Sequence, residues 1–152
     1  KHALKTKKAI TFLGTESKIY YDSLGVMGWQ FMDNGFKVLF SSDIPTIIAN
    51  NIRNDLTSFL NKQHLKISDI KNFIFHPGGK KVLTAYEEAL KVKGDFLKNT
   101  REVMNNNGNM SSATVLYVLK RFYKQDFENG YGLMVSMGPG FSCEMVLLQM
   151  NK

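Results

Sequence analysis

Two side chains with catalytic potential each stand beside a glycine turn. His76 ends an apolar run and precedes Pro77, Gly78 and Gly79, and Asn109 comes before a predicted helix. A histidine that ends a buried strand lies at the sheet edge where open α/β folds bind ligands. The Asn109 amide can project an N–H donor into a cleft beside the helix. Each also has a structural explanation: His76 as the end of a strand beside an ordinary turn, and Asn109 as the cap of the next helix.

Two glycine turns would shape a site around these side chains. In the first, Gly78 and Gly79 allow a ligand close to the backbone, and the N-terminus of the following helix favours anions. Lys80 and Lys81 add positive charge in the first turn of that helix. The second turn is the run Met137-Gly138-Pro139-Gly140 between two apolar segments, and its simplest explanation is a hairpin turn.

Hydrophobic periodicity predicts the elements that must position these residues. Apolar residues at three- and four-residue spacing predict helices over 43–60, 80–91 and 111–124. Short apolar runs predict strands at 9–13, 18–21, 26–32, 36–40, 72–76, 132–136 and 143–149. Strands that alternate with helices and end in a hairpin predict an α/β layer with a mixed β-sheet and packed helices.

Several local signals refine this prediction. Gly14 is expected to break the first extended segment, and Asn34-Gly35 is expected to form the turn of a β-hairpin because this pair tolerates positive φ. Asp43 is predicted as an N-cap, with Pro45 in the first helical turn. Ser111 or Ser112 is predicted to cap the helix over 111–124, with Val115, Leu116, Leu119 and Phe122 as its inward residues.

Composition limits the classes of function. The chain has 152 residues, 43% of them hydrophobic, which suits one globular domain. The net charge of +7 comes from dispersed lysines without an arginine-rich run, so we expect a solvated surface and neither a nucleic-acid nor a membrane partner. The single cysteine, Cys143, excludes an intramolecular disulfide and a cysteine zinc cage, and it suits the cytoplasm. We expect no bound metal.

Taken together, the motifs resemble a known family. The chain carries His76-Pro77-Gly78-Gly79, then Thr100-Arg101-Glu102-Val103, then the run 108–113 (Gly-Asn-Met-Ser-Ser-Ala), then Gly138-Pro139-Gly140. Their order and separation closely resemble the C-terminal half of type III polyketide synthases, the chalcone and stilbene synthases and their bacterial relatives. The stretches 26–29 and 42–45 resemble the bacterial branch. The resemblance covers the chain from about residue 9.

The resemblance implies a thiolase-like fold of two similar halves, in which residues 1–152 form the chalcone/stilbene synthase-like C-terminal domain. The N-terminal half, which carries the nucleophilic cysteine, is absent. The implied activity is that of an acyltransferase: decarboxylative condensation of malonyl-CoA with an acyl-CoA starter, then cyclisation. Coenzyme A thioesters are substrates, and no cofactor is needed. The implied partners are the N-terminal half of the same enzyme and, in a homodimer, a second copy. The fragment is expected to be inactive alone and to associate with itself.

The resemblance also assigns roles to residues. His76 would act with the missing cysteine, its imidazolium stabilising the thiolate, and His76 and Asn109 would donate to the thioester oxygen. Gly78, Gly79, Lys80 and Lys81 would lie near the coenzyme A arm, and Met137, Gly138, Pro139 and Gly140 would wall the cyclisation cavity. The family has Gly-Phe where this chain has Ser136-Met137, which leaves the product class open. Cys143 matches a non-catalytic position and is interpreted as a buried, inert thiol.

Two alternatives remain at this stage. A ketoacyl-carrier-protein synthase has the same fold and shares the roles of His and Asn. A non-catalytic acyl-CoA-binding module would use the basic surface alone. A parent gene that encodes an upstream half with a cysteine on a strand-to-helix turn would favour the enzyme.

Overall fold

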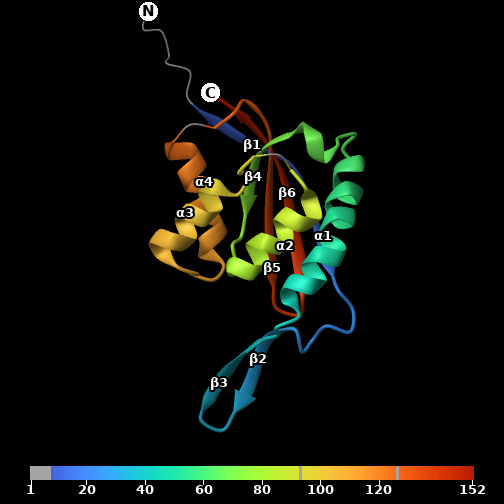
Figure 1. Cartoon of the computed structure of the whole chain (residues 1–152), viewed down its shortest axis with the longest axis vertical. Helices are drawn as coiled ribbons and strands as arrows, with labels where there is room; N and C mark the ends of the chain where they lie inside the picture. Colours follow the sequence, from blue (N-terminus) through green and yellow to red (C-terminus); the bar gives the residue numbers. More distant parts are fainter. Residues whose placement is uncertain (1–7, 93, 126) are drawn as a thin grey trace, which may run out of the picture.

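The core of the fold is a four-stranded mixed sheet with the strand order β1-β6-β5-β4 (Figure 1). The computed structural model describes residues 8–92, 94–125 and 127–152, so the first seven residues of the predicted domain lie outside the described residues. The strands are β1 (Ala9–Ile19), β4 (Ile70–Phe75), β5 (Gly130–Gly138) and β6 (Ser142–Asn151). Strands β4 and β5 are parallel, and the other pairs are antiparallel. The predicted mixed sheet is confirmed.

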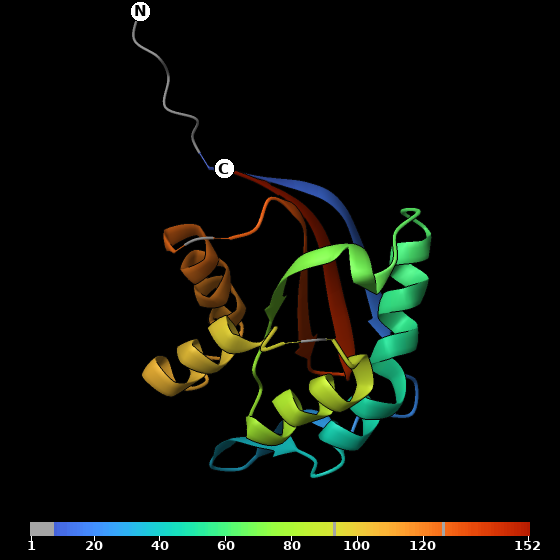
Figure 2. The same cartoon turned by 45° about the horizontal axis from the view of Figure 1, so that its top comes forward.

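Helices cover both faces of this sheet (Figure 2). Helices α1 (Ile44–Asn61) and α2 (Lys80–Leu90) pack on one face, against residues of β5 and β6 such as Val135 and Met145. Helices α3 (Lys98–Asn107) and α4 (Ala113–Lys124) pack on the other face, where Leu148 and Met150 of β6 contribute to a second apolar cluster. A short 3₁₀ helix, Ile67–Asp69, leads from α1 into β4. No helix in the described part of the chain is long and apolar enough to cross a bilayer.

Helix α1 forms because its apolar residues recur along one face that the sheet buries. The buried residues of this face include Ile44, Ile48, Ile52, Leu56, Phe59 and Leu60. Asp43 occupies the N-cap position as predicted, but its side chain makes no capping hydrogen bond. Its carboxylate instead accepts a hydrogen bond from Ser41 Oγ at 3.0 Å, and the first helical hydrogen bond joins Ile47 N–H to the Asp43 backbone carbonyl at 2.9 Å.

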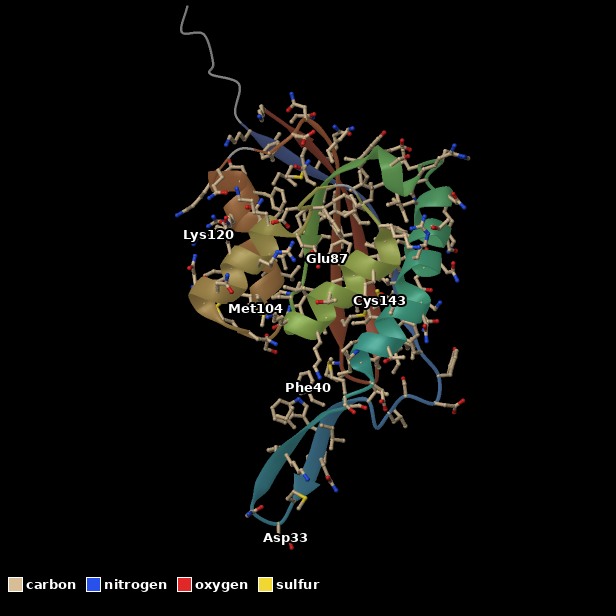
Figure 3. All side chains as sticks on the ribbon, viewed as in Figure 1. Asp33, Phe40, Glu87, Met104, Lys120 and Cys143 are labelled. Carbon is tan, nitrogen blue, oxygen red and sulfur yellow. The ribbon has the colours of Figure 1, made fainter. Side chains whose placement is uncertain are left out.

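Strands β2 (Met27–Met32) and β3 (Gly35–Phe40) form a separate hairpin that projects from the body of the molecule, with Asp33 at its tip (Figures 1 and 3). The hairpin is confirmed, but its predicted turn is wrong by one residue. Met32 pairs with Gly35, so the two turn residues are Asp33 and Asn34. Only Gly35 of this segment adopts a positive φ, 137°, because a residue without a Cβ enters that region most readily.

The predicted break at Gly14 is also wrong. Strand β1 runs through Gly14 and pairs with β6 along its whole length, with a register shift between Phe12 and Gly14. A bulge of this kind absorbs an extra residue without ending the strand. Here a glycine marks an irregularity inside a strand, not a boundary between two segments.

Helix α3 is an element that periodicity did not predict. Its sequence is polar, and only Thr100 and Val103 are buried, so it has almost no apolar stripe. The neighbouring α4 begins at Ala113 with Ser112, one of its two predicted caps, at the N-cap position, although the Ser112 side chain makes no capping hydrogen bond. Ser111 has a φ of 61° and lies outside the helix. The inward face of α4 also differs: its buried residues are Thr114, Val115, Val118 and Phe122. Leu116 is 56% exposed, so its predicted inward position is wrong, and Leu119 is half-buried.

Candidate active site

A cavity of about 720 Å³ opens where five segments meet. These are the base of the β2–β3 hairpin, the start of α1, the turn from β4 into α2, the loop before α4 and the turn between β5 and β6. The cavity lining includes nearly all the residues that the sequence singled out: His76, Gly78, Gly79, Lys80, Lys81, Asn109, Met137, Gly138 and Pro139. Gly140 is the exception. Its N–H donates to the carbonyl of Met27 at 3.0 Å, which fastens the β5–β6 turn to the hairpin.

His76 is held by the parallel sheet at the point where β4 ends. Its backbone N–H donates to the Val135 carbonyl at 2.8 Å and so continues the β4–β5 pairing by one residue. The Nδ1 atom is buried and has no hydrogen-bond partner among the described residues. Burial lowers the pKa of the imidazole below its usual value, because a desolvated site penalises the charged form. At neutral pH the His76 side chain is therefore uncharged in this chain.

The turn after His76 directs the backbone into α2. Gly78 has a φ of 58°, in the left-handed region that glycine tolerates. A Cβ on Gly78 would come within 3.3 Å of Val82 Cγ2, so a side chain there would crowd the first turn of α2. Helix α2 has no acidic residue in its first turn, and Lys80 and Lys81 are exposed there. This edge of the cavity therefore combines a helix N-terminus with positive charge and favours an anion.

Asn109 connects the loop before α4 to the turn after His76. Its Nδ2 donates to the Gly78 carbonyl at 3.0 Å, and its Oδ1 accepts from Ser111 N–H at 2.9 Å. The N-cap of α4 is Ser112, so Asn109 as the cap of this helix is wrong, and its oxygen instead accepts from the loop residue before that cap. The amide oxygen organises the start of α4, and the amide NH₂ faces the glycine turn that lines the cavity. The two predicted donor-bearing residues, far apart in sequence, are brought to one cavity by this contact.

The far wall of the cavity was not predicted from the sequence. It is the base of the hairpin, where Met27 pairs with Phe40 and Trp29 pairs with Val38, and all four side chains line the cavity. Phe40 lies where the hairpin meets the body of the molecule (Figure 3). The sequence did contain one indication of this wall. The four residues alternate along the two predicted strands, so their side chains share one face of the hairpin. The sequence did not show which part of the chain this face would meet.

Cys143 lies in the core between the sheet and helices α1 and α2, away from the cavity lining (Figure 3). The side chain is fully buried, and burial raises the pKa of its thiol to about 12. The thiolate is the nucleophilic form of cysteine, so Cys143 stays protonated and inert at neutral pH. Within the described residues, no group of three or more His, Cys, Asp or Glu side chains is arranged to hold a metal ion.

Comparison with known families supports a specific assignment. Residues 15–151 match the family described as chalcone and stilbene synthases, C-terminal domain. The chain is 40% identical to a putative chalcone synthase of Bacillus subtilis (strain 168), in an alignment that covers 97% of this chain and 41% of that protein. It is 35% identical to the 1,3,6,8-tetrahydroxynaphthalene synthase of Streptomyces peucetius subsp. caesius, over 89% of this chain and 36% of that enzyme. The chain therefore spans about two-fifths of the length of these relatives.

Comparison with solved structures agrees. The fold matches the crystal structure of the C-terminal type III polyketide synthase domain of Steely1, a type I/III hybrid from Dictyostelium, with a TM-score of 0.83 and 26% sequence identity. The match covers 92% of this chain and 40% of that one. The thiolase-like α/β fold implied by the sequence motifs is thereby confirmed.

Proposed function

Because this chain belongs to the chalcone and stilbene synthase family of type III polyketide synthases, we propose that it supplies two residues of a Cys-His-Asn condensing site. The complete enzyme is an acyltransferase. It loads a starter acyl group from coenzyme A onto a cysteine of the N-terminal half, then condenses it with malonyl-CoA and cyclises the product. The observation that carries the proposal is the 3.0 Å hydrogen bond from Asn109 Nδ2 to the Gly78 carbonyl, which brings both donor-bearing segments to one cavity.

The chemistry explains why these residue types are suitable. When malonyl-CoA loses CO₂, the carbon–carbon bond breaks and its electron pair moves toward the thioester oxygen, which gains enolate character. The step needs preorganised hydrogen-bond donors at that oxygen and no proton acceptor. The NH₂ of Asn109 is such a donor, and it does not titrate. The N–H of His76 is the second donor, and its neutral form still carries one N–H.

His76 has a second role with the nucleophile. In this chain alone the pKa of the imidazole is lowered by burial. A cysteine thiolate placed beside it by the N-terminal half would favour the charged imidazolium and raise that pKa again. The same ion pair would lower the pKa of the cysteine and activate it toward an acyl-CoA thioester. The isolated chain lacks this thiolate, and Cys143, buried and protonated, does not replace it.

The cavity lining combines positive charge with apolar surface, and both suit an acyl-CoA. Lys80 and Lys81, exposed at the start of α2, would lie near the phosphate-bearing coenzyme A arm. Met137, Gly138 and Pro139 would wall the space for the growing polyketide, together with the apolar base of the hairpin. Gly140 would act indirectly, by holding the β5–β6 turn against Met27. We place this chemistry in the cytoplasm, since a single unpaired cysteine suits a reducing compartment.

Exposed apolar side chains on the surface of this chain support the proposal that it binds a protein partner. Phe31 and Phe36 on the hairpin are 80% and 66% exposed, and Phe12 on β1 and Leu116 on α4 are 66% and 56% exposed. Apolar surface on this scale marks an interface in soluble proteins. We assign it to the N-terminal half of the same enzyme and, in the homodimer, to a second copy.

The isolated chain is expected to self-associate through these faces, because water exposure of the aromatic side chains is unfavourable. Sedimentation velocity at micromolar concentration should show dimers or larger species, and the double variant Phe31→Ser/Phe36→Ser should shift the population toward monomer. The matched control Tyr21→Ser removes an exposed aromatic group outside the hairpin and should leave the population unchanged. A wild-type chain that sediments as a clean monomer would contradict this assignment.

The proposed activity is tested by product analysis. A full-length synthase that contains this domain is expected to convert malonyl-CoA and an acyl-CoA starter into a cyclised polyketide with release of CO₂ and coenzyme A. The chain of 152 residues alone is expected to give none. Binding of acyl-CoA without turnover by the full-length protein would favour a non-catalytic binding module, and turnover only with carrier-protein thioesters would favour a ketoacyl-carrier-protein synthase.

A further inference from the structure

The threonine in the first turn of α4 uses its hydroxyl outside the helix. Thr114 is fully buried and is one of few buried polar residues in the described part of the chain. Its Oγ1 accepts a hydrogen bond from Met110 N–H at 2.8 Å and donates one to Asn109 Oδ1 at 3.4 Å. Both bonds run back to the loop that carries Asn109. The side chain of Thr114 therefore contacts the cavity-lining amide without lining the cavity itself.

These contacts determine which way the Asn109 amide faces. Two donors, the Ser111 N–H and the Thr114 hydroxyl, point at Oδ1. A reversed amide would place its NH₂ against the Ser111 N–H, which can only donate. The Thr114 hydroxyl already accepts from Met110 N–H, so on reversal its own hydrogen would lose Oδ1, the one acceptor that it has among the described residues. On the opposite side, Gly78 presents a carbonyl oxygen, which accepts from Nδ2. One of the two NH₂ hydrogens is thereby used, and the other is available to a ligand in the cavity.

The backbone of this loop also depends on Thr114. Gly108 and Ser111 both have positive φ angles, 69° and 61°. A non-glycine residue such as Ser111 is rarely found in that region and persists there only when surrounding contacts require it. The bond from Met110 N–H to Thr114 Oγ1 and the bond from Thr114 N–H to the Ser111 carbonyl, at 3.0 Å, are two such contacts.

We propose that Thr114 is a positioning residue whose hydroxyl fixes the polarity of the Asn109 amide, so that its NH₂ and not its carbonyl faces the cavity. The proposal deepens the proposed function, because it rests on that function for the donor role of Asn109. The orientation of the amide, however, is a property of this chain and can be measured without activity. A helix leaves two χ1 rotamers open to threonine, and the contacts with Met110 N–H and Asn109 Oδ1 hold the hydroxyl in the one seen here.

The first experiment uses the isolated chain and nuclear magnetic resonance. The side-chain NH₂ signals of Asn109 are identified by their loss in Asn109→Ala, and their Overhauser contacts to Gly78 report the orientation of the amide. In Thr114→Val, which keeps the shape and removes the hydroxyl, these contacts should be lost and the NH₂ shifts should move toward those of a solvated amide. In Thr114→Ser, which restores the hydroxyl, both should return to their wild-type values.

Controls separate this effect from a general loss of structure. Thr57→Val removes a hydroxyl that donates to the Arg53 carbonyl on α1, far from the cavity, and should leave the Asn109 signals unchanged. The backbone amide spectrum checks that Thr114→Val remains folded. If that variant is folded and the Asn109 contacts persist, the proposal is wrong. If Thr114→Val does not fold, the test rests on Thr114→Ser, which keeps the hydroxyl. Wild-type Asn109 signals in Thr114→Ser support the proposal, and loss of these signals overturns it.

The second experiment measures activity in a full-length synthase. Thr114→Val should lower kcat for malonyl-CoA decarboxylation by roughly tenfold, about the effect of one lost neutral hydrogen bond, with little change in KM, and Thr114→Ser should restore it. A changed Asn109 signal with normal decarboxylation would support the positioning of the amide and remove the donor role assigned to Asn109. An unchanged Asn109 signal with lowered decarboxylation would overturn the positioning and leave the proposed function standing.

Discussion

Replacement of Asn109 by alanine in a full-length synthase is expected to lower malonyl-CoA decarboxylation by roughly 10²–10³, the usual effect of removing one donor from an oxyanion site. Acylation of the cysteine should be largely unchanged. The two steps differ because the enolate oxygen exists only in the decarboxylation transition state, and only that step needs the Asn109 NH₂. Decarboxylation is measured as the release of labelled CO₂ from malonyl-CoA. Acylation is measured separately, as the rate of acyl-enzyme formation from the starter.

Two further variants make this test specific. Asn109→Asp keeps the shape but replaces the donor by an acceptor that repels an enolate, so it should not restore decarboxylation. Asn106→Ala removes an exposed amide at the end of α3, three residues away in sequence, and should have no effect on either step. Equal loss of acylation and decarboxylation in Asn109→Ala would contradict the role assigned to Asn109.

Replacement of His76 by glutamine should produce the opposite pattern. The glutamine NH₂ still donates a hydrogen bond but cannot carry the positive charge that stabilises a thiolate. Acylation of the cysteine is therefore expected to fall by on the order of 10²–10⁴, the range for loss of a positioned acid–base group. Decarboxylation by enzyme that is already acylated should fall less. The measurements are those used for Asn109, with a pH profile of cysteine alkylation to follow the thiolate directly.

The control for His76 is His64, which is exposed beyond the end of α1 and has a φ of 57°. His64→Asn should leave both steps unchanged, since asparagine tolerates the left-handed region. In His76→Gln the alkylation profile should shift to higher pH, because the cysteine loses the cation that lowers its pKa. A variant that acylates at the wild-type rate would show that His76 does not activate the nucleophile.

The predictable parts of this protein were those encoded by local patterns. Helix α1 follows from apolar residues at helical spacing between Ile44 and Leu60 and from Pro45 at its start. The hairpin follows from two apolar runs around Asp33–Gly35. Within the candidate site, the sequence motifs indicated His76, Asn109 and two glycine turns, and all of these residues except Gly140 line one cavity.

The errors in α3 and α4 share one physical origin. Helix α3 lacks an apolar stripe, and its inward residue Thr100 is fixed by a hydrogen bond from its hydroxyl to the Phe75 carbonyl at 3.2 Å, a contact across 25 residues. Leu116 was predicted to face inward because leucine is apolar. In the structure α4 instead buries Thr114 and leaves Leu116 exposed. Hydrophobic periodicity does not carry information about such polar contacts, because they depend on where the partner segment lies.

The sequence by itself thus determined the class of fold, His76 and Asn109 as the residues to look for at one site, and Cys143 as a buried thiol, because these depend on residue type, spacing and the pattern of burial along single elements. Only the tertiary structure decided three features: the hairpin as a wall of the cavity, the direction of the Asn109 amide and the buried Thr114 hydroxyl that holds it. The first two features bring together segments that are far apart along the chain. The third depends on a loop whose residues Gly108 and Ser111 have positive φ angles. The geometry of all three features follows from how the sheet and helices pack together, and not from the residues of any one segment.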